Sequence, residues 1–480
     1  MKRLLIAIVG VAAGILAYQL FVPPVVGLAD QGDFLRTIGR FGYGPQHHGS
    51  LEYQYIEPKY IPDPRYRQPY WEQANSEYLF VSAALLLNKL VSKDDALDIT
   101  VMGLIHALVF LVVFARLLWV ARRHPAHAIV WIGALVALTD AGYAVYWNSF
   151  YQEAASCIFL LLLLAEAVEI GRAAEVRFAS LLRWSLWAVL WVFAKPQNAP
   201  IGLIMGLFTF RLAFWTRERA PRWIAAAGGC AMLACAAYGV IAMPVVGRMA
   251  NSYGMVFSGI LPESKDPAAD LRALGFDPQL ARYSGTGAWS PVTDFPELAE
   301  SGALRRVSTF TILRFYLLRP ARLWRRLHGV LPRISFLRPP YGNFEPSAGL
   351  PAQSLSRAFN LWSGFHEHVL PVFNKWIVFA LILWPMYAAR IWYRETDLMR
   401  RRRTELLTLL PVCCLAALFG AVFGDAFDLI KHLYLFNLLL DACLLYAAAE
   451  GCKAAMGRIR SQTTSIGTGP NLRHPSVKLT

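Results

Sequence analysis

Four short polar clusters stand out in a chain that is otherwise strongly apolar. In chain order they are Asp30-Gln31-Gly32-Asp33-Phe34-Leu35-Arg36, Asn148-Ser149-Phe150-Tyr151-Gln152-Glu153, Lys195-Pro196-Gln197-Asn198 and Asp425-Ala426-Phe427-Asp428-Leu429-Ile430-Lys431-His432. Carboxylates can take the proton of a reacting hydroxyl group. Lysines can hold negative charge in a site that excludes water. These residue types therefore suit acid–base and anion-binding chemistry, provided that the four clusters meet.

The elements between the clusters are long apolar segments. The chain has 480 residues, of which 56% are hydrophobic and 16% charged, and its mean hydropathy is +0.39. A soluble chain of this length would carry a more charged surface, and the composition excludes disordered, collagen-like and small disulfide-rich proteins. We therefore predict an all-α polytopic membrane protein with about ten transmembrane helices. They are expected at residues 4–22, 99–120, 128–146, 152–170, 184–195, 198–212, 223–246, 369–389, 405–423 and 433–449.

Short basic loops predict the orientation of these spans. If the N-terminus is cytoplasmic, alternating spans place the short Arg-rich loops on one side, including Arg122-Arg123 and the run from Arg400 to Arg403, as the positive-inside rule expects. The formal net charge of +15 then needs no nucleic-acid partner. Residues 184–212 are interpreted as two spans broken at Lys195-Pro196, because a single span would reverse everything after it. All four polar clusters then lie on the outer face.

Two long segments, 23–98 and 247–368, are predicted to face the same outer side. Each contains an apolar stretch that is expected to form a helix at the membrane surface, Tyr78–Val91 in the first and Phe310–Leu331 in the second.

The chain is predicted to form one membrane domain, residues 1–450, followed by a basic and largely disordered cytoplasmic tail, residues 451–480. The chain has seven cysteines, an odd number, and most of them lie in apolar runs. Both features argue against a disulfide framework. Asp140 and Asp441 fall inside predicted spans, where a carboxylate is costly and is expected to face a polar pocket or pair with a buried lysine or arginine.

Each polar cluster also has a purely structural explanation. Acids can mark the end of a span, a serine and a glutamine can cap a helix, a lysine can extend toward the membrane surface, and ion pairs can form along one helical turn. These explanations concern Asp30 and Asp33, Ser149 and Gln152, Lys195, and Asp428 with Lys431 or His432. Independent loops have no reason to place such residues at one depth, so a shared site is favoured.

The clusters and the loops around them resemble the GT-C glycosyltransferases, which are multispan enzymes that use lipid-linked sugars. An acidic pair after the first span, a first outer loop with an interfacial helix and a second large outer loop carry this resemblance. Four motifs more narrowly resemble bacterial glycan-biosynthesis hexose transferases of the WsfD type: Ala-Asp-Gln-Gly-Asp-Phe (29–34), Asn-Ser-Phe-Tyr-Gln-Glu (148–153), Lys-Pro-Gln (195–197) and Lys-His-Leu-Tyr-Leu-Phe-Asn (431–437). The acidic dipeptide usual in this family is Asp-Gln here, and the second acid is Asp33.

The resemblance implies a transfer of a hexose from a polyprenyl-phosphate donor to a glycan or lipid-linked acceptor, with inversion, on the outer face of the bacterial cytoplasmic membrane. Asp30 or Asp33 is then the expected catalytic base. The residues expected at the donor phosphate are Arg36, Lys195, Lys431 and His432. The residues expected at sugar or acceptor hydroxyl groups are Glu153, Gln197, Asp425 and Asp428.

No cofactor is expected, and no ligand spacing indicates a metal, although a divalent ion is compatible with the chemistry. A lipid-linked glycan flippase or transporter is one alternative, but such proteins usually contain paired repeats, and none is visible. A glycan polymerase or ligase is another alternative, which the Arg-rich segment 305–338 keeps open.

Overall fold

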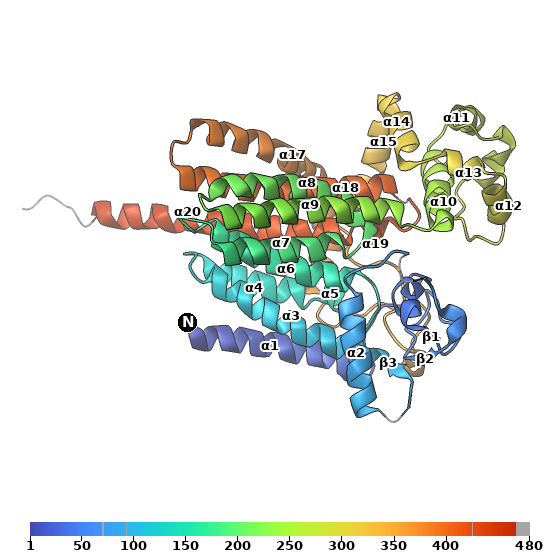
Figure 1. The fold of residues 1–480 in the computed structure, drawn as a ribbon, viewed down its shortest axis with the longest axis horizontal. Helices are drawn as coiled ribbons and strands as arrows, with labels where there is room; N and C mark the ends of the chain where they lie inside the picture. Colours follow the sequence, from blue (N-terminus) through green and yellow to red (C-terminus); the bar gives the residue numbers. More distant parts are fainter. Residues whose placement is uncertain (70–71, 93, 425, 467–480) are drawn as a thin grey trace, which may run out of the picture.

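Long apolar helices run side by side and form a bundle, and smaller elements gather at one end of it (Figure 1). The computed structural model describes residues 1–69, 72–92, 94–424 and 426–466.

Seven helices in this described part of the chain are long and apolar enough to cross a membrane. They are α1 (Lys2–Phe21), α3 (Ile99–Ala121), α8 (Ala199–Leu212) with its flanking 3-10 turns η4 (Pro196–Asn198) and η5 (Ala213–Trp215), α9 (Arg219–Ile241), α17 (Leu370–Arg394), α18 (Leu398–Gly424) and α20 (Tyr434–Ile466). The predicted fold class, an all-α polytopic membrane protein, is confirmed.

Three further helices stand where other spans were predicted: α4 (His127–Leu138), α6 (Glu153–Ile170) and α7 (Phe178–Val192). The predicted span 128–146 is interrupted, because the Oδ1 atom of Asp140 accepts the N–H of Gly142 at 2.7 Å and starts the separate short helix α5 (Ala141–Ala144). Within α6, the buried carboxylate of Glu166 is held by Arg116 and Arg183, each at 2.8 Å.

Glycines allow α8 and α9 to pack closely. A Cβ atom added to Gly206 would lie 3.1 Å from the carbonyl oxygen of Gly229, and one added to Gly229 would lie 3.0 Å from that of Gly206. Such small-residue contacts bring helix backbones together in membranes. At the outer end of α9, a Cβ on Gly239 would lie 3.2 Å from the Cα of Pro196, so α9 packs directly against the break at Lys195-Pro196.

The first outer segment, residues 23–98, is named for the side that it is predicted to face. It contains one helix and a small sheet. The helix α2 spans Tyr78–Val91, as predicted, and crosses the ends of the spans (Figure 1). The three-stranded antiparallel sheet has the order β1-β2-β3, with Tyr43 opposite Pro62 and Lys59 opposite Asp98. Its strands are β1 (Tyr43–Pro45), β2 (Lys59–Pro62) and β3 (Leu97–Asp98), which leads into α3; the 3-10 turns of this segment are η1 (Phe34–Arg36), η2 (Ile38–Phe41) and η3 (Pro64–Tyr66).

The second outer segment, residues 247–368 and likewise named for its predicted side, consists mostly of short helices, the first of which begins just before it. They are α10 (Val245–Tyr253), η6 (Gly254–Ile260), α11 (Pro267–Leu274), η7 (Pro278–Tyr283), α12 (Phe295–Glu300), α13 (Ala303–Arg306), α14 (Thr309–Leu317), α15 (Pro320–Val330), η8 (Leu331–Arg333), η9 (Pro346–Ala348) and α16 (Leu361–His368). The single helix predicted for 310–331 is wrong, because Pro320 begins a new helix and the residue before a proline is disfavoured in helical geometry.

The two ends of the bundle carry the segments that the orientation argument assigned to opposite sides of the membrane. The N-terminus, the α17–α18 connection and the end of α20 lie at one end, and both long segments lie at the other (Figure 1). Helix α20 continues to Ile466, so a helix covers part of the tail that was expected to be disordered. Residues 467–480 lie outside the described residues.

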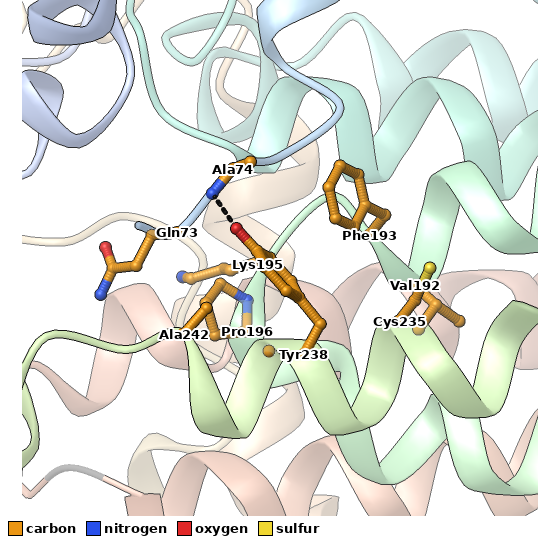
Figure 2. Close-up of a pocket in the computed structure, with 10 residues that line it drawn as sticks. Gln73, Ala74, Val192, Phe193, Lys195, Pro196, Cys235, Tyr238 and Ala242 are labelled. Carbon is orange, nitrogen blue, oxygen red and sulfur yellow. Dashed lines mark hydrogen bonds between the residues drawn. The ribbon is translucent and has the colours of Figure 1, made fainter. Parts of the chain in front are cut away.

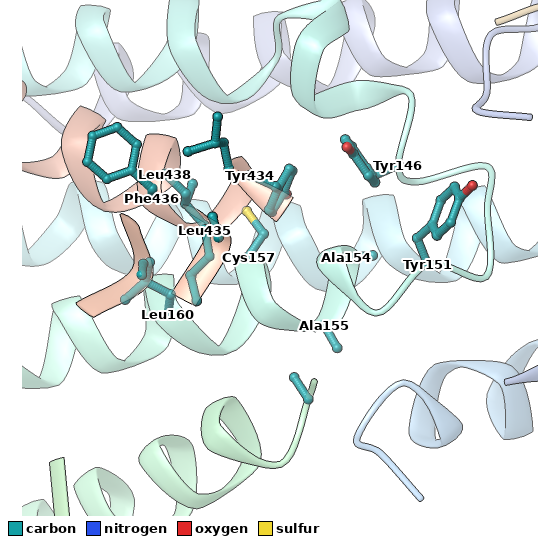
Figure 3. Close-up of a cluster of buried hydrophobic side chains, with 14 of the residues drawn as sticks. Tyr146, Tyr151, Ala154, Ala155, Cys157, Leu160, Tyr434, Leu435, Phe436 and Leu438 are labelled. Carbon is teal, nitrogen blue, oxygen red and sulfur yellow. The ribbon is translucent and has the colours of Figure 1, made fainter. Parts of the chain in front are cut away.

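The start of α20 packs against α6 in the interior of the bundle (Figure 3). The rings of Tyr434 and Tyr146 are 4.5 Å apart between centroids, and Cys157 is completely buried beside them. All seven cysteines are free, as predicted. This apolar core lies directly beneath the polar clusters.

Candidate functional site

The four polar clusters meet at the end of the bundle that carries the outer segments. Lys431 of the last cluster binds Asp33 of the first, and Lys195 of the third binds Glu153 of the second. Segments that are far apart in sequence therefore form one charged cluster.

Asp30 lies in a tight turn after α1. Its Oδ1 atom accepts the N–H groups of Gly32 at 2.8 Å and Phe34 at 3.1 Å. Gly32 has a φ of +95°, which favours glycine. The side chain is buried, and burial raises the pKa of the Asp30 carboxyl to about 7. Within the described residues, no hydrogen bond reaches its Oδ2 atom, so that oxygen is available to a substrate.

The second cluster and the second outer segment hold the Asp30 turn in place. Asn148 donates from its side chain to the carbonyl oxygens of Leu20 at 3.1 Å and Val26 at 2.8 Å, which fixes the chain as it leaves α1. The backbone N–H of Ala29 donates to the carbonyl of Gly342 at 2.9 Å. A Cβ on Gly342 would lie 1.9 Å from the carbonyl oxygen of Gln54, so only glycine permits this approach.

Asp33 lies between two cations. Its Oδ1 atom is 2.8 Å from Arg36, and its Oδ2 atom accepts from Lys431, which is almost completely buried. Burial alone would raise the pKa of Asp33, but Arg36 and Lys431 outweigh burial and hold that pKa well below its usual range. Burial likewise opposes the charge of Lys431, yet Asp33 and Asp428 raise the pKa of its amine. This carboxylate and this amine are therefore both charged.

Lys195 pairs with Glu153 at 2.6 Å, and both side chains are largely buried. The break at Lys195-Pro196 that the sequence predicted is present, because η4 starts at Pro196 and separates α7 from α8. Burial lowers the pKa of Lys195, and Glu153 opposes that effect. A small pocket lies between these groups and is lined by residues that include Glu153, Lys195, Gln197 and Lys431.

Two further predicted residues contact each other, and a third contacts the second outer segment. Gln197 donates to the carbonyl oxygen of His432 at 2.7 Å, and its Oε1 atom is 3.0 Å from the Nδ1 of His432. Asp428 accepts from the hydroxyl of Tyr341 at 2.6 Å. Asp425 lies outside the described residues.

Two of the structural explanations do not hold. Gln152 is the N-cap of α6, but its side chain makes no capping bond, and Ser149 instead accepts the N–H of Tyr151 at 3.2 Å. Lys431 reaches across to Asp33 rather than along its own turn. Seven of the nine predicted site residues that the structure describes therefore contact another member of the set, and Asp30 and Asp428 have other partners. Their roles in a reaction stay predictions.

Sequence reasoning missed two tyrosines of this site. The hydroxyl of Tyr151 donates to the carbonyl of Ala29 at 2.9 Å and accepts the N–H of Gln31 at 3.1 Å. The amine of Lys431 lies 4.8 Å from the centre of its ring, a cation–π contact. Tyr341 holds Asp428. Tyr151 lies in the motif 148–153, which was singled out for Glu153, whereas nothing in the sequence distinguishes Tyr341.

The two intramembrane acids have partners other than the expected lysine or arginine. Asp140 accepts the backbone N–H groups of Trp362 at 2.7 Å and Ser363 at 3.1 Å, at the start of α16. Asp441 accepts from Tyr143 at 2.6 Å and lies 2.8 Å from the Nε2 of His366. They fasten the second outer segment to the bundle below the site. Among the described residues no group of three His, Cys, Asp or Glu side chains is arranged to hold a metal ion.

Solved structures match nearly the whole chain at low sequence identity. The oligosaccharyltransferase AglB of Archaeoglobus fulgidus, in complex with an inhibitory peptide and a dolichol-phosphate, is 15% identical with a TM-score of 0.41; the match covers 98% of this chain and 53% of that one. The A. fulgidus oligosaccharyltransferase tethered to an acceptor peptide is 12% identical with a TM-score of 0.39, over 98% and 52% of the two chains. This chain thus spans about half the length of those proteins. No curated protein matches it.

A family match covers nearly the whole sequence. Residues 1–468 match the family described as the YfdI N-terminal transmembrane domain. That range contains α1 through α20 and every site residue described above. The chain belongs to the YfdI N-terminal transmembrane domain family.

Proposed function

We propose that this protein is a membrane glycosyltransferase of GT-C type that transfers a hexose from a polyprenyl-phosphate donor to a glycan acceptor, on the outer face of the bacterial cytoplasmic membrane. One observation carries the proposal. Asp30, a buried carboxylate with a pKa of about 7, lies three residues before Asp33. Asp33 in turn pairs with Lys431, which lines a polar pocket together with a second buried lysine, Lys195. A base and an anion-binding site are the two parts that this displacement needs.

In the proposed reaction, Asp30 takes the proton of the acceptor hydroxyl at its Oδ2 atom. The acceptor oxygen forms a bond to the anomeric carbon, and the bond from that carbon to the phosphate oxygen breaks. The leaving polyprenyl phosphate keeps the electron pair, and Lys195 and Lys431 stabilise its charge together with Arg36. Attack opposite the phosphate inverts the anomeric configuration.

The other residues position the reactants in this proposal. Asp33 stays ionised because of its cations, which suits a hydrogen-bond acceptor better than a base. Glu153 and Gln197 line the pocket, and His432 contacts Gln197. Glu153, Gln197 and Asp428 are assigned to hydroxyl groups of sugar or acceptor, and His432 is assigned to the phosphate. Bound metal is not required in this scheme, and activity with and without a chelator tests that part.

The test is transfer from a synthetic polyprenyl-phosphate hexose in detergent. Asp30→Asn keeps the shape of the turn but removes the base, so turnover should fall by roughly two to four orders of magnitude. Asp33→Asn should lose activity mainly through weaker substrate binding. Asp95→Asn, which changes an exposed acid of the same outer segment, is the matched control and should keep wild-type turnover.

The outcomes separate the roles. Near wild-type turnover by Asp30→Asn at saturating donor and acceptor would refute the base assignment. Loss of turnover in Asp33→Asn alone would exchange the two roles. No transfer by the wild-type protein, together with donor-dependent movement of lipid-linked glycan across vesicles, would favour the flippase alternative.

A further inference from the structure

Tyr53 connects two carboxylates of the site. Its N–H donates to the carbonyl of Asp30 at 2.7 Å, and its ring meets that of Tyr341 edge to face, with the centroids 5.3 Å apart. The hydroxyl of Tyr341 in turn donates to the Oδ1 atom of Asp428 at 2.6 Å. One tyrosine therefore joins the turn that carries Asp30 to the cluster that carries Asp428.

The backbone of Tyr53 is held in an uncommon conformation. Its φ is +62°, in the left-handed region that few residues other than glycine adopt. The N–H of Gly342 donates to the carbonyl of Tyr53 at 3.0 Å, so both the N–H and the C=O of this residue are fixed by hydrogen bonds. Strain of this kind persists only where the surroundings impose it, and it is common where proteins hold ligands. The ring is thus positioned before a ligand binds.

Both carboxylates keep one oxygen available beside this ring. The Oδ1 atom of Asp30 accepts two backbone N–H groups, and the Oδ1 atom of Asp428 accepts the hydroxyl of Tyr341. No hydrogen bond within the described part of the chain reaches the Oδ2 atom of either acid, and neither acid forms an ion pair there. Tyr53 itself is partly exposed, so a ligand can reach its ring.

The charge around the ring of Tyr53 is negative. Burial raises the pKa of its hydroxyl, and the acids Asp428, Asp33 and Glu52 raise that pKa further. Asp33 is neutralised by its two cations, but Asp428 and Glu52 pair with no cation among the described residues. A ligand at this ring therefore meets hydrogen-bond acceptors and negative charge.

The lysines of the site serve a different region. Lys195 and Lys431 line the polar pocket, and Tyr53 is not part of that lining. Lys195 also lines a small cavity next to the loop at Ala74, whose N–H donates to the hydroxyl of Tyr238 at 2.9 Å (Figure 2). The site thus divides into a cationic part, which suits the donor phosphate, and an acidic and aromatic part around Tyr53.

An uncharged sugar ring matches the acidic and aromatic part. Sugar hydroxyl groups donate hydrogen bonds to carboxylate oxygens, and the C–H groups of a sugar ring can pack on the negative face of an aromatic ring. A phosphate or a carboxylate would instead meet like charge, which costs affinity.

We propose that Tyr53, Tyr341 and Asp428 form the acceptor subsite, which takes an uncharged sugar ring with its reacting hydroxyl at the Oδ2 atom of Asp30 and another hydroxyl at the Oδ2 atom of Asp428. The inference rests on the proposed function and deepens it, because it names the chemistry of the acceptor. The bonds that form and break are those of the transfer already proposed.

The first test compares ligands that differ only in charge. The probes are methyl glycosides of neutral hexoses, of hexuronic acids and of the corresponding hexuronamides, which have the shape of the hexuronates without the charge. They are supplied with the synthetic polyprenyl-phosphate hexose, as acceptors or as competitive inhibitors. We expect the hexuronamides to bind at least about tenfold more tightly than the hexuronates.

The second test changes the ring. Tyr53→Ala should raise the KM for the hexoside acceptor about tenfold and leave the KM for the donor unchanged, whereas Tyr53→Phe keeps the ring and should stay near wild type. Tyr55→Ala is the matched control, because Tyr55 lies in the same loop and its hydroxyl donates to the carbonyl of Leu350. Asp428→Asn can still accept from Tyr341, but it removes a charge and should weaken the discrimination against hexuronates.

The outcomes separate this inference from the proposed function. Transfer to hexosides with equal affinity for hexuronates and hexuronamides, or a raised donor KM in Tyr53→Ala, overturns the acceptor subsite and leaves the glycosyltransferase standing. If no probe is glycosylated, saturation-transfer NMR of the methyl hexosides tests the subsite by itself. A signal that Tyr53→Ala loses and Tyr55→Ala keeps supports the subsite although the transferase fails, and no signal overturns the subsite as well. Matching unfolding midpoints for these two variants exclude misfolding as the cause.

Discussion

The Nε2 atom of His106 lies 2.7 Å from the Oε1 atom of Glu77, and both side chains are completely buried. The Nδ1 of the same ring is 2.8 Å from the carbonyl oxygen of Trp147, so both ring nitrogens face acceptors. The second carboxylate oxygen of Glu77 accepts the N–H of Ala155 at 3.0 Å. This pair joins the start of α2 to the first turn of α6, which carries Glu153.

Glu77→Ala should destabilise the protein strongly, because it leaves a buried histidine and a buried N–H without an acceptor. Breaking such a pair costs about 3–5 kcal/mol. Glu77→Gln should cost only about 1 kcal/mol, since the amide oxygen can accept from Ala155 and the amide N–H₂ can donate to a neutral His106. Thermal unfolding in detergent measures the difference, with exposed Glu300→Ala as the control. Equal midpoints for the alanine and glutamine variants would contradict this assignment.

A second prediction separates the structural and the binding role of Lys195. Lys195→Met strands the buried Glu153 and should lower both the unfolding midpoint and donor affinity. Adding Glu153→Gln removes the stranded charge and should recover most of the stability, but it cannot recover a phosphate ligand. Lys195→Arg keeps the charge with altered geometry and should retain part of the donor binding. Wild-type donor affinity in the double variant would exclude Lys195 from the phosphate site.

The sequence allowed the convergence of the polar clusters to be predicted, because apolar spans fix which loops share a side of the membrane. It did not allow the pairing within the site to be predicted. Asp428, Lys431 and His432 look like one self-paired turn, and only the packed fold brings Asp33 to Lys431 and Tyr341 to Asp428. Spacing along a helix says nothing about a partner in a distant part of the chain.

Two other features had a signal in the sequence, and one did not. Pro320 marks the break between α14 and α15, and a proline of this kind ends a helix before it. A lone histidine in the apolar run of α3 resembles ordinary core, so His106 gave no signal for Glu77. The helix Tyr78–Val91 was predictable because it is a continuous apolar run, and the run is too short to span a membrane.

A third prediction concerns the membrane orientation. The Arg-rich start of α18 lies at the end of the bundle opposite the two long segments (Figure 1). In a variant without the native cysteines, Arg401→Cys should react with a membrane-impermeant maleimide only after the cells are opened. Gln279→Cys, in the second outer segment, should react in intact cells. Labelling of residue 401 from outside would reverse the orientation and would place the site in the cytoplasm.

The last prediction follows from the burial of Asp30, which raises the pKa of its carboxyl to about 7. A base must be ionised to accept a proton, so kcat/KM should fall about tenfold per pH unit below that pKa and level off above it. Stability should depend on pH in the opposite sense. The folded pKa lies above the unfolded value, so the folded state holds an extra proton between them. The stabilisation that this proton gives is complete below the unfolded pKa and is lost as the pH rises through about 7.

Asp30→Asn removes this titration while its amide oxygen can still accept from Gly32 and Phe34. The variant should therefore unfold at the same temperature as the wild type near pH 4. At pH 8 it should be more stable than the wild type, by up to a few kcal/mol, although its turnover should be roughly two to four orders of magnitude lower. Unfolding midpoints at the two pH values measure this, with Asp95→Asn as the control that shifts at neither. A lower midpoint for Asp30→Asn at pH 8 would mean that the ionised carboxylate anchors the turn. A higher midpoint would support the assignment, because a catalytic base must be ionised to act even where its charge destabilises the folded state.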